Sequence, residues 1–189
     1  MNAHYNLAFT LAKQGRTEEA APEYMEALRI RPDYAYAHCN LANALSAMGR
    51  LDEAMTHYRE ALRLNPDYPD AHKNFGVALG QKGQFVEAIR QFREVLRLNP
   101  NSAAAHNDIG AALASQSQYR QAALEFSEAL RLDPTLADAY SNLGNVLVAE
   151  DNLTAAVQEF REALRIEPGH AEARRNLSIL EAHLRDGQK

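Results

Sequence analysis

The chain of 189 residues contains no tryptophan and a single cysteine, Cys39. One cysteine excludes an internal disulfide framework and fits a reducing compartment. No apolar run approaches the roughly 18 residues of a membrane span, and the N-terminal residues lack the basic and apolar regions of a signal peptide. We therefore expect a soluble, cytoplasmic protein with no membrane partner within this chain.

The sequence also lacks clusters of like charge and the known catalytic and phosphate-binding motifs. The 20 basic and 25 acidic residues give a net charge of −5 and are interspersed, so no basic block is available to neutralise a phosphate backbone. The sequence has no glycine-rich phosphate loop and no catalytic motif. We expect no nucleic-acid partner, no cofactor, no enzymatic activity and no catalytic residue.

Internal repetition is the strongest feature that the sequence does contain. Prolines recur every 34 residues, at Pro32, Pro66, Pro100, Pro134 and Pro168. Other columns recur in register with them, such as the aromatic column Tyr24, Tyr58, Phe92, Phe126 and Phe160. A fixed period of this length indicates an array of similar structural units, which here accounts for residues 1–170.

Each unit is predicted to form two helices joined by a tight turn, because its apolar and small residues follow helical spacing and never a period of two. In the first unit the apolar stripes run through Leu7, Ala8 and Leu11 and then through Ala20, Tyr24, Ala27 and Leu28. Between the stripes lie glycines that can end the first helix in a left-handed conformation, namely Gly15, Gly49 and Gly83. The recurring proline ends the second helix, because it lacks the N–H that would continue the hydrogen-bond ladder.

These columns resemble the tetratricopeptide repeat (TPR). The resemblance implies an all-α fold, a right-handed solenoid of helix-turn-helix repeats closed by a C-terminal capping helix. The expected boundaries are 1–34, 35–68, 69–102, 103–136 and 137–170 for the five repeats and 171–189 for the capping helix and a short tail. Arg174, Arg175 and Glu181 replace apolar residues of the repeat pattern, so the capping helix should keep one face in water.

Three residues depart from the repeat pattern. Ser117 and Asp151 stand where the turn glycine is expected in the fourth and fifth units, which leaves the geometry of those turns open. Pro22 lies inside the second helix of the first unit, where we expect it to kink or delay that helix by removing a backbone hydrogen bond.

In the TPR family the first helices line a concave surface where ligands commonly lie, so the resemblance implies a groove here. Asparagines recur on this predicted face, at Asn6, Asn40, Asn74, Asn142 and Asn176 in one column and at Asn43, Asn107 and Asn145 beside it. An amide side chain both donates and accepts hydrogen bonds, so a row of asparagines can hold the backbone of an extended peptide. The same side chains could instead cap helices, bridge neighbouring helices or bind water, and the sequence leaves both interpretations open.

Aromatic residues form a second feature of the predicted groove, where they often carry much of the binding energy. The groove positions of the N-terminal half include Tyr5, Phe9 and Tyr36, and the nearby repeat junctions include Tyr34 and Tyr68. The charged groove residues are Lys73, which is the main base, and Asp108, Asp138 and Glu172 in the C-terminal half. The alternative interpretation is that Tyr34 and Tyr68 pack between helices and that a missing N-terminal segment covers Tyr5 and Phe9.

One histidine recurs in each of the first four units, at His4, His38, His72 and His106. Histidine is a common metal ligand, so a metal site has to be considered. The ligands of one zinc ion lie about 2.0–2.1 Å from it, whereas neighbouring helix layers are about 8–10 Å apart. We therefore predict packing residues and no metal site. Cys39 directly follows His38, and adjacent residues on a helix do not face each other, so a cysteine–histidine nucleophile is not expected.

The predicted function is that of a protein-interaction scaffold, which binds an extended protein or peptide segment in the groove through the asparagines and the aromatic residues. Two alternatives stay open. Residues 37–42 and 139–144 are similar to repeats in the TPR arm of O-linked N-acetylglucosamine transferases, so the chain could be the substrate-selecting arm of a larger glycosyltransferase. No capping segment precedes Met1, which favours a fragment and leaves a helix face on which copies could stack into a self-assembling homo-oligomer.

Overall fold

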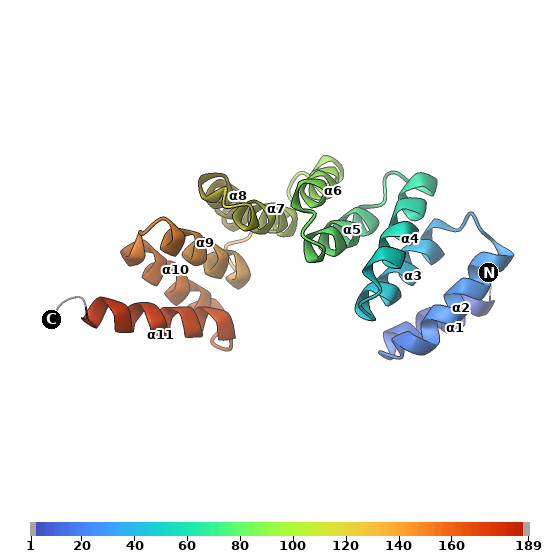
Figure 1. Cartoon of the computed structure of the whole chain (residues 1–189), viewed down its shortest axis with the longest axis horizontal. Coiled ribbons are helices and arrows are strands. Elements are labelled where there is room, and N and C mark those ends of the chain that lie inside the picture. The colour runs from blue at the N-terminus through green and yellow to red at the C-terminus, as the bar shows by residue number, and fades with distance from the viewer. Residues whose placement is uncertain (1–2, 187–189) are drawn as a thin grey trace. The chain divides into compact units, whose positions relative to one another are not determined.

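The computed structural model describes residues 3–186, and in this range it contains eleven helices and no strands (Figure 1). The all-α, helix-turn-helix organisation predicted from the sequence is confirmed. The chain divides into two compact units, unit 1 over Met1–Leu98 and unit 2 over Asn99–Lys189.

Each unit is a series of helix pairs. Unit 1 comprises α1 (Ala3–Lys13) with α2 (Thr17–Ile30), α3 (Ala35–Ala47) with α4 (Leu51–Leu64), and α5 (Pro69–Gln81) with α6 (Phe85–Leu98). Unit 2 comprises α7 (Ala103–Ser115) with α8 (Tyr119–Leu132), α9 (Ala137–Ala149) with α10 (Leu153–Ile166), and the final helix α11 (Ala171–Asp186). The two helices of a pair lie side by side, and within its unit each second helix also packs on the next first helix.

First helices approach one another more closely than second helices do. Within unit 1, α1 contacts α3 and α3 contacts α5; within unit 2, α7 contacts α9 and α9 contacts α11. Among the described residues no such contact joins α2, α4 and α6, or α8 and α10. Each unit therefore curves toward its first helices, whose side chains line the inner surface.

The turns inside the pairs share one geometry, whichever residue occupies them. Gly15, Gly49 and Gly83 have φ angles of 75°, 74° and 72°. Ser117 and Asp151 take the same left-handed conformation, with φ angles of 59° and 60°. The two substitutions thus keep the turn, although a residue with a side chain adopts this conformation at a cost of about 1–2 kcal/mol.

Pro22 does not delay the start of α2, so the delay that the sequence suggested as one of two effects is wrong. The helix begins at Thr17, the position equivalent to Leu51 at the start of α4, and continues to Ile30. The carbonyl that proline leaves without an N–H partner is that of Glu18 in the first turn, where a carbonyl can tilt toward water.

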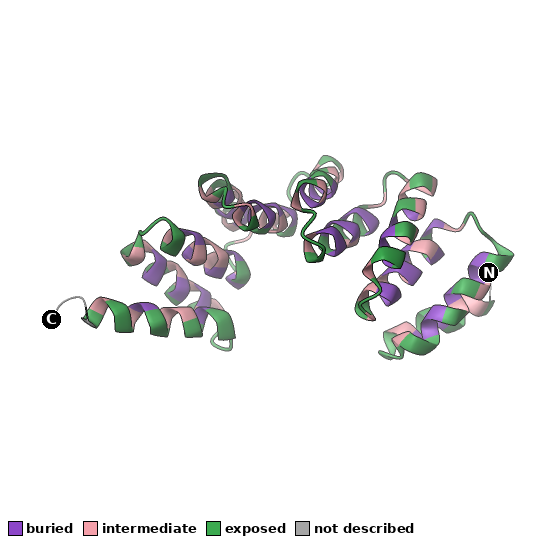
Figure 2. Ribbon diagram, viewed as in Figure 1, coloured by how far each residue is buried: buried purple, intermediate pink, exposed green. Residues whose placement is uncertain are grey.

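The core of each pair forms where a small residue on the first helix meets an aromatic ring on the second. In unit 2, a Cβ added to Gly110 would lie 2.6 Å from the ring of Phe126, and one added to Gly144 would lie 2.7 Å from the ring of Phe160. Both rings are buried, and Figure 2 shows buried residues along the facing sides of the paired helices. Close approach of the ring therefore accounts for glycine at these two positions.

Leu7 does not belong to the buried stripe of the first helix, so the prediction is wrong for this residue. Its side chain is 48% exposed, whereas Leu41 in the same column is 0% exposed. No helix pair precedes α1 among the described residues to cover Leu7. The stripe is confirmed for Ala8 and Leu11, which are buried.

Helix α11 covers the last pair with one face and keeps the other in water, as predicted for a capping helix. Ala173 and Leu180 are buried against the core around Phe160. Arg174 and Arg175 are exposed. The predicted tail beyond the helix, 187–189, lies outside the described residues.

Ser141 places an unsatisfied polar group in the core of unit 2. Its side chain is 1% exposed, and its Oγ forms no hydrogen bond with any described residue. One of the equivalent residues of unit 1, Cys39, is equally buried and has no comparable need for a hydrogen bond.

We expect Ser141→Ala to raise the free energy of unfolding by about 1 kcal/mol, because an unsatisfied buried group costs about 1–3 kcal/mol. Urea unfolding followed by circular dichroism measures the change. Ser102→Ala is the matched control and should lower stability, since Ser102 Oγ accepts a hydrogen bond from the Ala105 N–H at 3.3 Å and caps α7. A Ser141→Ala protein less stable than the wild type would contradict the prediction.

Candidate functional site

The residues predicted to line a groove lie on the first helices of both units. In unit 1 they are Tyr5, Asn6 and Phe9 on α1, Tyr36, Asn40 and Asn43 on α3, and Lys73 and Asn74 on α5. In unit 2 they are Asn107 on α7, Asn142 and Asn145 on α9, and Asn176 on α11. All of these residues belong to the helices toward which their unit curves.

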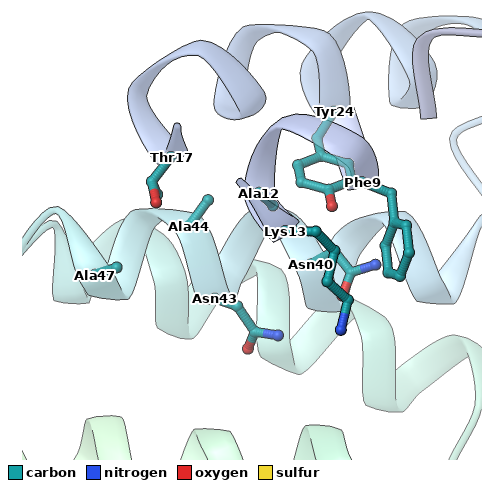
Figure 3. Close-up of a pocket in the computed structure, with 9 residues that line it drawn as sticks. All are labelled: Phe9, Ala12, Lys13, Thr17, Tyr24, Asn40, Asn43, Ala44 and Ala47. Carbon is teal, nitrogen blue, oxygen red and sulfur yellow. The ribbon is translucent and has the colours of Figure 1, made fainter. Parts of the chain in front are cut away.

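A hollow of about 310 Å³ lies between α1 and α3 (Figure 3). Its wall includes Phe9 and Lys13 from α1, Tyr24 from α2, and Asn40 and Asn43 from α3. In Figure 3 the side chains of Lys13, Asn40 and Asn43 extend toward the same side of the hollow. An aromatic ring, an ammonium group and two amides are therefore available to one ligand.

The hollow recurs at equivalent positions along the repeats. A second, of about 300 Å³, lies between α3 and α5 and shares Asn43 and Ala47 with the first. In unit 2 a hollow of about 450 Å³ lies between α9 and α11. The three walls each contain a ring from a second helix, namely Tyr24, Tyr58 or Phe160. Within unit 1, the two neighbouring hollows can receive successive side chains of one extended chain.

The asparagines of unit 1 form hydrogen bonds between neighbouring repeats. Asn40 Nδ2 donates to the Tyr5 hydroxyl at 3.0 Å, and Asn74 Nδ2 donates to Asn43 Oδ1 at 2.9 Å. The Tyr58 hydroxyl donates to the same Asn43 oxygen at 2.7 Å. Each donating amide keeps a second N–H for another partner, so these bonds orient the amides without exhausting them.

The asparagines of unit 2 are paired in the same manner. Asn142 Nδ2 donates to Asn107 Oδ1 at 3.0 Å, and Asn176 Nδ2 donates to Asn145 Oδ1 at 2.7 Å. Asn145 Nδ2 in turn donates to Glu172 Oε1 at 2.9 Å. Bridging of neighbouring helices, which the sequence left open, is therefore one role of these side chains.

Five aromatic rings of unit 1 follow one another in contact and are called the aromatic row: Phe9, Tyr5, Tyr34, Tyr36 and Tyr68. Their successive ring centroids are 6.3, 4.8, 6.0 and 5.0 Å apart. Phe9 and Tyr36 are 44% and 49% exposed, and the other three rings are half-buried. Tyr34 and Tyr68 thus pack at the starts of α3 and α5 and also extend the row.

Burial keeps the hydroxyl groups of this region protonated. It raises the pKa of Tyr5 to about 12, with a further contribution from Tyr34, and it also raises the pKa of Tyr68. Burial raises the pKa of the Cys39 thiol to about 11, which leaves little reactive thiolate at neutral pH. The hydroxyls of Tyr5 and Tyr68 are therefore neutral, and Cys39 is a packing residue.

The recurring histidines pack on the second helix of their own pair, as a structural role requires. The pairs are His4 with Glu23, His38 with His57, His72 with Gln91 and His106 with Glu125, at 2.6, 3.0, 2.8 and 2.7 Å. Over residues 3–186 no group of three or more histidine, cysteine or acidic side chains could hold a metal ion. None of the helices in this range has the length and apolar character needed to cross a bilayer.

Two kinds of residue in the walls of the hollows were not predicted from the sequence. Lys13 Nζ lies 5.5 Å from the ring centroid of Phe9, and the spacing of four residues along a helix would have identified this pair. Tyr24 and Tyr58 belong to the apolar stripes of the second helices, and only the assembled repeats show that their rings also form the walls of hollows.

Comparison with known proteins identifies the repeat. The profile of the TPR repeat family matches residues 10–49, 42–83, 76–117 and 110–151, and a second tetratricopeptide-repeat profile matches residues 137–170. No curated protein matches the chain significantly.

Several solved structures have the same fold. YrrB, described as a TPR protein with an unusual peptide-binding site, is 25% identical with a TM-score of 0.76, over 92% of this chain and 89% of YrrB. MamA from Desulfovibrio magneticus RS-1 is 23% identical with a TM-score of 0.82, over 89% of this chain and 95% of that structure. PilF from Pseudomonas aeruginosa is 21% identical with a TM-score of 0.79, over 97% and 90% of the two chains.

The profile matches together extend over residues 10–170. The helix pairs of the structure, their left-handed turns and the meeting of small residues with aromatic rings recur across these same residues. The chain therefore belongs to the tetratricopeptide-repeat family.

Proposed function

We propose that the chain is a protein-interaction scaffold that binds an extended peptide along the first helices, without catalysis of its own. The observation that carries this proposal is the hollow that recurs between successive first helices, with asparagine amides in every wall. The five predicted repeats and a cytoplasmic location remain part of the proposal. YrrB, a relative with the same fold, is described as having a peptide-binding site.

The spacing of the helices suits an extended ligand. Packed helices lie about 8–10 Å apart, and an extended chain rises about 3.3 Å per residue. Each step from one first helix to the next therefore corresponds to about three peptide residues. Amides held in place by the hydrogen bonds of Asn40 and Asn74 would then meet the peptide backbone at regular intervals.

Selection of a displayed library of random peptides on the full chain tests the proposal. We expect the selected peptides to lose about tenfold in affinity for Asn40→Ala/Asn74→Ala, because two hydrogen bonds of about 0.5–1.5 kcal/mol each are removed. Asn101→Ala/Asn152→Ala, which changes two exposed asparagines outside the first helices, is the matched control. Unchanged affinity in a folded Asn40→Ala/Asn74→Ala protein, verified by circular dichroism, would refute the role of the amides.

Self-assembly is a second candidate, which the exposure of Leu7 on α1 favours. A second copy that covers this face would bury Leu7 as the core buries Leu41. Sedimentation of the wild type and of Leu7→Glu over a range of concentrations separates the two functions. A mass that rises with concentration only in the wild type would support assembly.

The arm of a glycosyltransferase has no such support, since none of the relatives named above is described as a transferase.

A further inference from the structure

The aromatic row is an addition to the TPR scaffold of unit 1. The column of Tyr34 and Tyr68 continues in unit 2 with Ser102, Leu136 and His170. The column of Tyr36 continues with Asp70, Ala104, Asp138 and Glu172. Equivalent helix pairs form without aromatic residues at these positions, so packing of the repeat does not require the row.

Two positively charged side chains that form no ion pair among the described residues lie against rings of the aromatic row. The Arg31 guanidinium lies 3.6 Å from the ring centroid of Tyr34, and Lys13 Nζ lies over Phe9. Neither cation, nor Lys73 on α5, forms an ion pair with a carboxylate among the described residues. The arginines near the ends of the second helices differ, because each is paired with the glutamate three residues before it: Arg29, Arg63, Arg97, Arg131 and Arg165. The Phe9 and Tyr34 part of the row therefore has positive charge left for a ligand, whereas the Asp70 carboxylate acts on the Tyr68 hydroxyl at the other end.

These observations select one class of extended ligand. A polyproline II chain has three residues per turn and a rise of about 3.1 Å per residue, so equivalent faces recur about every 9 Å, close to the separation of packed helices. Its carbonyls have no internal hydrogen bonds and can accept them from tyrosine hydroxyls of the row. Proline-rich segments dock in grooves lined by aromatic rings, and their conformation is formed before binding.

We propose that unit 1 binds a proline-rich peptide with acidic residues, in the polyproline II conformation, along the aromatic row. The proline rings lie on Phe9 and Tyr36, the two most exposed rings. The peptide carboxylates lie near Lys13 and Arg31. This inference rests on the proposed function and names the chemistry of the partner.

Three labelled peptides of about 12 residues, or about 37 Å of polyproline II chain, test the proposal by fluorescence anisotropy with the full chain. They consist of Pro-Pro-Glu, Pro-Pro-Gln and Gly-Ser-Glu repeats. We expect the Pro-Pro-Glu peptide to bind most tightly and the Pro-Pro-Gln peptide about threefold less tightly. This difference should disappear in high salt, because salt screens exposed charges. The Gly-Ser-Glu peptide should bind at least tenfold less tightly than the first.

Variants locate the bound peptide. Tyr36→Ala should weaken the Pro-Pro-Glu peptide about tenfold, and Tyr36→Phe should retain most of the affinity because it keeps the ring. Tyr119→Ala, at the start of α8 in unit 2, is the matched control and should bind as the wild type does. Affinity unchanged by Tyr36→Ala, or no preference for proline over the Gly-Ser-Glu peptide, would overturn the proposal.

The library selection separates this inference from the proposed function. Selected peptides without proline that still depend on Asn40 and Asn74 would leave the scaffold function in place and overturn the proline-rich ligand. Failure of every peptide, selected or designed, to bind the first helices would remove both. Selected peptides rich in proline that depend on Tyr36 would support both.

Discussion

Changing Phe126 to alanine is expected to lower the free energy of unfolding by about 3–5 kcal/mol, the usual cost of removing a buried aromatic ring. The ring is 1% exposed and lies against Gly110. Gly110→Ala should itself cost about 1–3 kcal/mol, because its new methyl group would lie 2.6 Å from the ring. Urea unfolding followed by circular dichroism measures both changes.

The two substitutions should be coupled. In the Gly110→Ala/Phe126→Ala protein the new methyl group occupies space that the ring has left, so the total loss should be smaller than the sum of the single losses by about 1 kcal/mol or more. Gly80→Ala is the matched control. No atom lies within 4 Å of a Cβ added at Gly80, so this change should stabilise α5 by up to about 1 kcal/mol. Additive losses, or stabilisation by Gly110→Ala, would contradict the close packing.

Acidification is expected to destabilise unit 1 through a pair of imidazoles. His38 Nδ1 and His57 Nδ1 are 3.0 Å apart, and His38 Nε2 donates to the Pro32 carbonyl at 2.9 Å. Neutral His38 therefore accepts from His57 Nδ1–H. Burial, and then the charge of His38, lower the pKa of His57, although Glu53 and Glu60 act in the opposite direction.

Because the pKa of His57 is lower in the folded chain than in the unfolded chain, the unfolded chain binds more protons between the two values. The stability contributed by this group is present above the unfolded pKa of about 6.5 and is lost as the pH falls below it. We expect the free energy of unfolding to fall between pH 7 and pH 5, because the unfolded chain takes up the proton that the folded chain resists. Urea unfolding at a series of pH values measures this loss.

The chain supplies its own control for the imidazole pair. His72 faces Gln91 at 2.8 Å in the equivalent position of the next repeat, so His57→Gln should keep a hydrogen bond to His38 and remove the imidazole of residue 57. The loss of stability between pH 7 and pH 5 should be smaller in this variant. An equal loss in both proteins would assign the effect to other groups.

Much of the fold could be predicted from the sequence, because the contacts that form a helix pair are local and recur with the period. Helical spacing, turn glycine and terminal proline all lie within one repeat and predict the same helix-turn-helix unit. Even Ser117 and Asp151 take the turn conformation of glycine, because the helices on either side impose it. Pro22 does not delay the start of α2, because a proline near a helix start is less disruptive than one at its centre.

The candidate site was only partly predictable, because its contacts join different repeats. The sequence placed the asparagines on one face. It did not show that Asn74 bonds to Asn43 and Asn40 to Tyr5. These partners are 31 and 35 residues apart, one on each side of the 34-residue period, so a single column cannot reveal them.

The sequence by itself determined the repeat, its two helices and the face that carries the amides and rings, because periodic spacing decides which residues share a side of a helix. Only the tertiary structure decided how neighbouring repeats combine: the pairing of the amides, the order of rings in the aromatic row, and the exposure of Leu7. Each of these depends on how closely one helix packs on the next, and therefore on side chains that the period alone does not bring together.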